Sequence, residues 1–283
     1  MEINMKKILI FLFFILILFS FISISSAHEA NEENEKKYMG ERIDDFFRKS
    51  SGNLAIISSI IITLLVYISI KIKKTEKIKY TLFILISLVI ILTTIYLSGT
   101  TIYLNIISET GGPVHWHSDF EIWNCGEEVN LISPTGLTNK VGNPVLHEHN
   151  DNRVHVEGVL LEKKHADLHS FFEVIGGSLT SERLTVPTDN GIIDMENKDK
   201  CKEKEGKLQA FLLKVKNPSA LKKDGFIFEQ TKLENFENYI LSPYAYVPPG
   251  DCIIIEFDIE KDKTDKICES YTVAIERGDL KEE

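Results

Sequence analysis

The chain has 283 residues, of which 43% are hydrophobic, and its formal net charge at neutral pH is −10. An acidic surface repels phosphate backbones, so we expect no nucleic acid partner, whereas cations are attracted. The apolar residues are concentrated in about the first third of the chain. Residues 109–283 carry 33 Asp and Glu against 20 Lys and Arg and are numerous enough to bury a core of their own.

Two lysines precede the first apolar run, residues 8–24, and small residues up to Ala27 follow it. This order of charged, apolar and small segments is typical of a secretory signal. If the run is retained, its roughly 17 residues just suffice to cross a bilayer as a helix. We therefore expect residues 1–27 to form a signal peptide or an uncleaved anchor helix, and residues 28–53 to form a short external segment.

Two further apolar runs, residues 54–70 and 81–97, contain no charged side chain. Each is about as long as the shortest spanning helices, and apolar side chains on every face argue against a soluble surface helix. Five lysines lie in the connector, residues 71–80, and the positive-inside rule places such a loop in the cytoplasm. The sequence thus predicts a transmembrane helical hairpin over residues 54–98, with the lipid bilayer as a partner and residues 109–283 as an extracytoplasmic domain.

The cysteines agree with this topology, since all four lie in the domain predicted to be outside: Cys125, Cys201, Cys252 and Cys268. An even number of cysteines in an oxidising compartment favours disulfides. None has the two-residue spacing of a zinc-binding pair. We expect two disulfides, with all three pairings open.

The domain mixes strand and helix patterns without a strict βαβ alternation, so the expected fold class is α+β. Strands are predicted at residues 114–123, 153–161, 207–215, 252–257 and 267–275, and a charged loop at residues 194–206. One helix is predicted after Asp167, which can cap it, ending at Gly176 and Gly177. Thr231 and Glu234 match a capping box for a second helix that ends before Pro243.

Seven of the eight histidines fall between His115 and His169. On a continuous strand His115, His117, Asp119 and Glu121 would project from one face, with Trp116, Phe120 and Ile122 on the other. His147 with His149, and His155 with Glu157, repeat the alternation. If these strands lie side by side, their imidazoles converge in the manner of a metal site.

The predicted metal ligands are His115, His117, Glu121, His147, His149 and His155, and the expected cofactor is zinc or copper, bound for capture, delivery or sensing. One alternative is a metal-dependent enzyme with Glu121, Glu148 or Glu157 as general base. Another is a metal-free structural surface protein whose histidines are solvated or titrate with pH. His165 and His169 share one helical face and are expected to be peripheral.

Residues 115–121 resemble the first half of the cupin metal motif, in which two histidines separated by one residue precede a glutamate. The flanking glycines differ, because Thr110 replaces the first and Gly126 comes one residue early; the second motif has no counterpart after Pro249 and Gly250. The whole domain resembles membrane-tethered, histidine-rich ectodomains of prokaryotes, archaea above all, with a His-x-His strand, a His-Glu-His segment and a Phe-Phe helix before Gly-Gly. That resemblance implies a unit of fold and no particular reaction.

Overall fold

The computed structural model describes residues 39–283 except residue 74, residues 136–138 and residues 242–248. The chain divides into two compact units, Met1–Leu104 and Asn105–Glu283. The described residues form four α-helices and mixed sheets, which confirms the α+β class. The predicted signal segment, residues 1–27, lies outside the described residues, as do residues 28–38.

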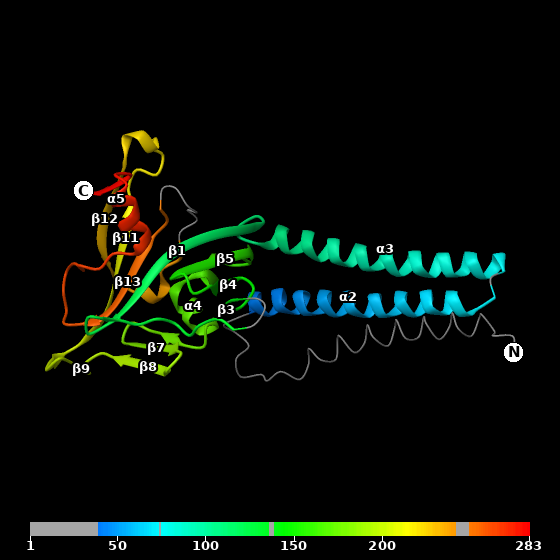
Figure 1. Ribbon diagram of the computed structural model, residues 1–283, viewed down its shortest axis with the longest axis horizontal. Coiled ribbons are helices and arrows are strands. Elements are labelled where there is room, and N and C mark those ends of the chain that lie inside the picture. The colour runs from blue at the N-terminus through cyan, green and yellow to red at the C-terminus, as the bar shows by residue number, and fades with distance from the viewer. Residues whose placement is uncertain (1–38, 74, 136–138, 242–248) are drawn as a thin grey trace. The chain divides into compact units, whose positions relative to one another are not determined.

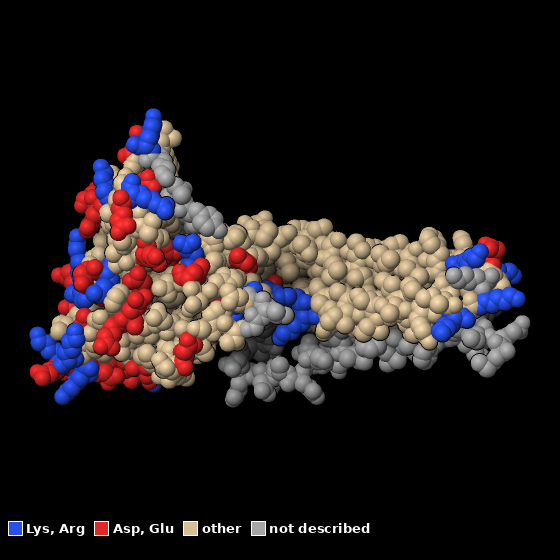
Figure 2. Space-filling view, viewed as in Figure 1, with Lys and Arg blue, Asp and Glu red and all other residues tan. Residues whose placement is uncertain are grey.

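The first unit contains the long helix α2 (Met39–Lys71) and all but the last three residues of the long helix α3 (Glu76–Ile107). Both are long and apolar enough to cross a membrane, and only 11% and 6% of their most apolar windows are buried, unlike core helices of a soluble protein. In the face seen in Figure 2, charged side chains gather toward the ends of these helices and leave the length between them uncharged. The two predicted apolar helices are thus present.

The helices extend beyond the predicted bounds, so the segment at residues 39–53 is part of α2 and the connector is shorter than residues 71–80. Polar residues continue each helix through pairs one turn apart. Asp44 pairs with Arg48 in α2, and Glu76 pairs with Lys79 at 2.7 Å in α3. Ser58 and Thr93, whose hydroxyl oxygens lie 2.6 Å apart, join the two helices by a hydrogen bond.

The second unit is built on a nine-stranded mixed sheet (Figure 1). Its strands lie in the order β14-β12-β11-β13-β1-β5-β4-β3, and β2 pairs with β1. The bounds are β1 (Pro113–Asn124), β2 (Glu127–Glu128), β3 (Val141–Gly142), β4 (Leu146–Glu148), β5 (Arg153–Val159), β11 (Lys207–Val215), β12 (Phe226–Leu233), β13 (Cys252–Asp258) and β14 (Leu280–Glu282). Strand β1 is central: it pairs in parallel with β13 on one side and antiparallel with β5 on the other.

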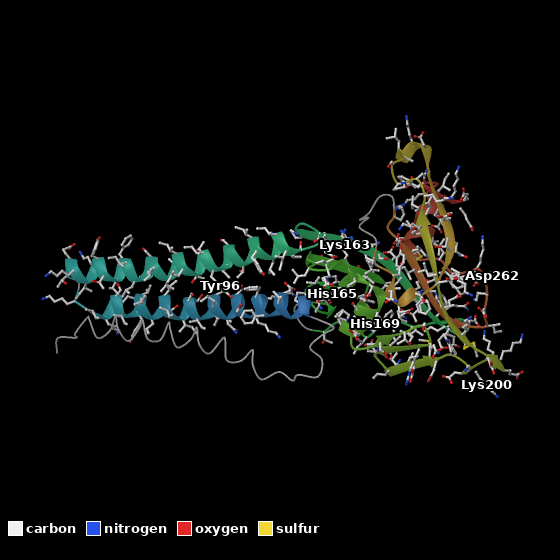
Figure 3. All side chains as sticks on the ribbon, turned by 180° about the vertical axis from the view of Figure 1, so that it is seen from behind. Tyr96, Lys163, His165, His169, Lys200 and Asp262 are labelled. Carbon is white, nitrogen blue, oxygen red and sulfur yellow. A yellow bond between two sulfur atoms is a disulfide. The ribbon has the colours of Figure 1, made fainter. Side chains whose placement is uncertain are left out.

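Smaller elements complete the unit. Two short sheets are formed by β6 (Ser178–Leu179), β7 (Arg183–Thr188) and β8 (Gly191–Glu196), and by β9 (Lys200–Cys201) and β10 (Lys204–Glu205). The helices are α4 (Leu168–Val174) and α5 (Glu269–Glu276), and the 3-10 turns are η2 (Lys163–Ala166), η3 (Lys222–Asp224) and η4 (Phe236–Asn238). Figure 3 labels Lys200 on the β9–β10 hairpin.

A separate apolar core lies on each face of the large sheet. On one face Phe120 and Val154 pack with Phe171 of α4. On the other face Ile254 and Phe211 pack with Tyr271 of α5. Because side chains alternate along each strand, β1 contributes to the first core through every second residue and leaves the side chains between them for the opposite face.

Several predicted elements are confirmed, namely the strands near residues 114–123, 153–161, 207–215 and 252–257 and the helix α4. Asp167 caps this helix, accepting a hydrogen bond from the Ser170 backbone N–H at 2.7 Å. Gly176, with φ of +90°, follows its end as predicted. The charged loop at residues 194–206 is only partly irregular, since it contains the end of β8 and all of β9 and β10.

Two predicted elements are wrong. The helix at Thr231 is absent, because β12 continues through Leu233 in register with Ala210 of β11, and these cross-strand bonds outweigh the local capping box. Only the turn η4 follows. The strand at residues 267–275 is helix α5, where Cys268, Tyr271 and Ala274 recur every third residue against the second core.

The structure pairs all four cysteines, which confirms the disulfides. Cys125 is bonded to Cys201, and Cys252 is bonded to Cys268. The first links the end of β1 to β9, and the second links the start of β13 to the residue that precedes α5. Disulfides are typical of an oxidising compartment.

Candidate metal centre

Three neighbouring strands carry histidines to one face of the large sheet, as their order in Figure 1 allows. His117 of β1 is the direct cross-strand partner of His155 of β5, and His155 is in turn the partner of His147 of β4. His115 is the partner of Glu157 in the adjacent position. Directly paired side chains on one face of a sheet lie in contact, so this register gathers the imidazoles.

The opposite faces of these strands explain why the histidines project as they do. Trp116, Phe120 and Ile122 pack in the first core, together with Val154 and Val156 of β5, which are fully buried. A one-residue slip of register would exchange the two faces and expose these apolar side chains. The apolar pattern of the strands therefore fixes the orientation of the histidines.

The imidazoles and Glu157 form two overlapping groups of possible metal ligands. The first group is His115, His117, His155 and Glu157, and the second is His147, His149 and His155. Within each group, one ligand atom per residue lies within 4.8 Å of the corresponding atom of every other member. All five histidines of the predicted site are thus brought together, and His155 belongs to both groups.

In the first group the donor atoms are close enough to share one ion. The Nε2 atoms of His115 and His117 lie 2.9 Å apart, and His115 Nε2 lies 3.2 Å from Oε1 of Glu157. Donors that lie 2.0–2.1 Å from one ion are about 3 Å apart when they are adjacent in its coordination sphere. Without an ion, at most one of the two facing nitrogens can carry the proton between them.

In the second group two imidazoles have the hydrogen-bond partners that metal-binding histidines commonly have. His149 donates from Nδ1 to the Asn139 carbonyl at 2.5 Å, so in the neutral tautomer its Nε2 atom is the one that can bind an ion. His155 Nε2 lies 3.1 Å from Oδ2 of Asp151, so it donates to this carboxylate and leaves Nδ1 as the acceptor. Both rings are thereby held in the tautomer that a ligand needs.

His147 is the most buried member of the cluster, with 1% of its surface exposed. Burial, followed by the positive charge of Lys140, lowers the pKa of His147 to about 4, so the imidazole is neutral at neutral pH. Its Nδ1 atom is buried and has no hydrogen-bond partner among the described residues. An unsatisfied buried nitrogen costs about 1–3 kcal/mol.

Glu121 does not join either group, although it projects from the same face of β1. Four residues of strand separate it from His117, which is about 13 Å. Its Oε2 atom accepts a hydrogen bond from Trp123 Nε1 at 3.0 Å, and burial raises the pKa of Glu121. Between Glu121 and His117 lies Asp119, which is paired with Arg153.

Glu148 and the two remaining histidines of the domain also lie outside both groups of described ligands. Glu148 is buried, alternates with His147 along β4, and accepts a hydrogen bond from the Asp151 backbone N–H at 2.6 Å, so it holds the turn before β5. His165 lies on η2 and His169 on α4 (Figure 3). His169 Nδ1 donates a hydrogen bond to the Leu179 carbonyl at 2.7 Å, and its Nε2 atom lies 3.2 Å from Oε1 of Glu173.

Sequence reasoning placed Glu157 in the strand alternation but not among the ligands. The signal was its position two residues after His155, on the same strand face. A comparison with protein-family models, curated proteins and solved structures found no match for this chain.

Proposed function

We propose that the unit Asn105–Glu283 binds a transition metal ion, zinc or copper, through its clustered histidines. The observation that carries the proposal is the row His117, His155 and His147, three imidazoles directly paired across three neighbouring strands. Histidines that are merely solvated on a sheet face need not be paired in this way. Here the middle ring contacts both outer rings, with centroid distances of 4.6 and 5.5 Å.

The donor chemistry selects the class of metal. Imidazole nitrogens suit zinc and copper, whereas magnesium and calcium prefer oxygen ligands. The four cysteines are consumed in disulfides and offer no thiolate. A carboxylate, Glu157, accompanies the imidazoles, which is compatible with zinc or Cu(II).

We propose further that this domain lies outside the cytoplasm, tethered by α2 and α3. Five lysines occur within residues 71–80, and a loop this basic is retained on the cytoplasmic side. The disulfides support the same orientation. A metal site held at a cell surface suits capture, delivery or sensing of an ion, and the exposure of His115, at 59% of its side chain, leaves the ion exchangeable.

A metal-dependent enzyme is the second candidate, and the same exposure supports it. An ion that is open to solvent beside His115 and Glu157 can keep a water ligand, whose pKa it lowers. A hydrolytic activity that needs the ion and disappears with the histidines would favour this candidate. Binding without turnover of ester or phosphoester substrates would favour capture.

The full-length chain, purified in detergent and dialysed against zinc or copper, should contain bound metal by elemental analysis. Replacing His115 and His117 together by alanine should lower the metal content. His165→Ala together with His169→Ala is the matched control, since it removes two histidines that lie outside both groups, and it should leave the metal content unchanged. A wild-type chain that binds neither ion at micromolar concentration refutes the proposal.

A further inference from the structure

We propose that the cluster holds two metal ions and that the carboxylate of Glu157 bridges them. The inference rests on the proposed metal binding and extends it to a second site. The first ion would be held by His115 and His117, and the second by His147, His149 and His155. Glu157 would contribute one oxygen to each.

The number and spread of the donors argue for two ions. A single ion with ligands at 2.0–2.1 Å cannot have two donors more than about 4.2 Å apart. Among the described residues, the five histidines and Glu157 do not form a single group of ligands that could surround one ion. They form two groups that share only His155. A single ion would therefore leave some of these histidines uncoordinated.

Each group is organised on its own. The first draws on the facing nitrogens of His115 and His117, which lie 2.9 Å apart on β1. The second draws on the buried His147, on His149 held by the Asn139 carbonyl, and on His155 held by Asp151. Asn139 and Asp151, which fix the second group, are members of neither group of ligands.

Glu157 belongs to the first group, and its two oxygens approach one histidine of each group. Its Oε1 atom is 3.2 Å from His115 Nε2, and its Oε2 atom is 3.8 Å from His147 Nε2. This is the arrangement of a bridging carboxylate, in which each oxygen binds one ion. Ions in two-metal sites are about 3.5–4 Å apart, a separation that one carboxylate can span.

A bridging carboxylate also reduces the electrostatic repulsion between the two metal ions. Two divalent cations at that separation repel each other, and imidazole ligands bring no charge to offset the repulsion. Glu157 supplies a negative charge between the ions. Asp151, through its hydrogen bond to His155, supplies a second one beside the second group.

The test is the zinc stoichiometry of the full-length chain in detergent, measured by elemental analysis and by calorimetric titration. The wild type should bind two zinc ions per chain. Glu157→Gln, which removes the charge and keeps the shape, should bind one ion tightly and lose at least about tenfold in affinity for the other. Glu173→Gln is the matched control, because Glu173 pairs with His169 at 3.2 Å outside the cluster, and it should still bind two.

Copper supplies an independent measurement. Two Cu(II) ions joined by a carboxylate couple magnetically, so the wild type loaded with two copper ions should give a weakened or half-field electron paramagnetic resonance signal. Glu157→Gln should give the signal of an isolated ion.

The outcomes separate the two proposals. One zinc per wild-type chain overturns the second ion and leaves metal binding intact, whereas no zinc overturns both. Two zinc ions with unchanged affinity in Glu157→Gln, or two magnetically isolated copper ions in the wild type, overturn the bridge.

Discussion

His117 of β1 and His155 of β5 are direct cross-strand partners whose imidazole rings lie 4.6 Å apart, edge to face. On its other side His155 stacks nearly parallel to His147 of β4, at 5.5 Å. The middle ring is thus the single histidine that belongs to both groups of donors. His155 therefore links the two groups.

His155→Ala should weaken binding of the second ion by at least about tenfold, because a lost ligand costs no less than a lost supporting hydrogen bond. His115→Ala, by contrast, should affect only the first position. Calorimetric titration of zinc into the full-length variants distinguishes the two patterns. The same pattern from both substitutions would contradict the assignment of His155 to the second ion.

Gly142→Ala should disturb the second group without touching its ligands. A Cβ atom on Gly142 would lie 2.5 Å from the Leu146 carbonyl oxygen and 3.0 Å from Cα of His147, so β4 must shift. Gly191→Ala is a matched control, because its φ of +116° is close to the +114° of Gly142 but nothing lies within 4 Å. Both variants pay the backbone strain of about 1–3 kcal/mol; only Gly142→Ala should also lose zinc affinity at the His147 position. Equal affinities in the two variants would argue against this role of β4.

Removal of the metal should lower the thermal stability of the second unit. An ion at one hundred times its dissociation constant contributes about 2.7 kcal/mol, and each kcal/mol shifts the melting temperature of a unit of this size by about 2–4 °C. Adding a chelator to the loaded chain should therefore lower the melting temperature by about 5–10 °C, followed by near-ultraviolet circular dichroism. No shift in the wild type, or an equal shift in His155→Ala, would contradict the prediction.

Loss of the two disulfides should destabilise the domain unequally. The bridges Cys125–Cys201 and Cys252–Cys268 close loops with sequence separations of 76 and 16 residues. Loop-closure entropy predicts a loss of about 4.5 kcal/mol for the first and about 3 kcal/mol for the second when both partners become serine. Denaturant unfolding of each double variant measures the difference. Free thiols titrated in the denatured, unreduced wild type would refute the pairing itself.

The proposed orientation predicts that protease added to intact cells or spheroplasts digests the chain after Glu109. The lysine-rich connector between α2 and α3 should remain protected until the membrane is permeabilised. Immunodetection with tags placed in the connector and at the C-terminus would follow the two regions. Complete protection of the C-terminal tag would show that the C-terminal domain lies inside the cell and would contradict the proposed orientation.

The fold was predictable where the local sequence pattern, such as the alternation of apolar and polar residues, determines the structure. The alternation around Trp116 and Phe120 predicts both the strand β1 and the face on which its histidines project, because the apolar side must be buried. The helix after Asp167 was predictable from its cap and from the glycines that follow it. These features depend on neighbouring residues alone.

The prediction failed where distant pairing decides. Strand β12 exists because β11 pairs with it, and α5 because Tyr271 packs against the second core, where its hydroxyl donates to the Leu213 carbonyl. The histidines were identifiable by their clustering, but the register that pairs His117 with His155 and places Glu157 beside His115 was not. That register depends on which strands become neighbours, and a single sequence does not reveal it.

Strand β1 carries both tryptophans of the chain, one on each side. Trp116 stands between His115 and His117 in sequence but packs against the first core. Trp123 lies about 23 Å further along, with Lys266 over its ring. The tryptophan emission of the intact protein, excited selectively, therefore comes from a single strand. A paramagnetic ion bound at the histidines would quench Trp116 far more than Trp123. The protein thus contains its own fluorescent reporter and, on the same strand, its own internal reference.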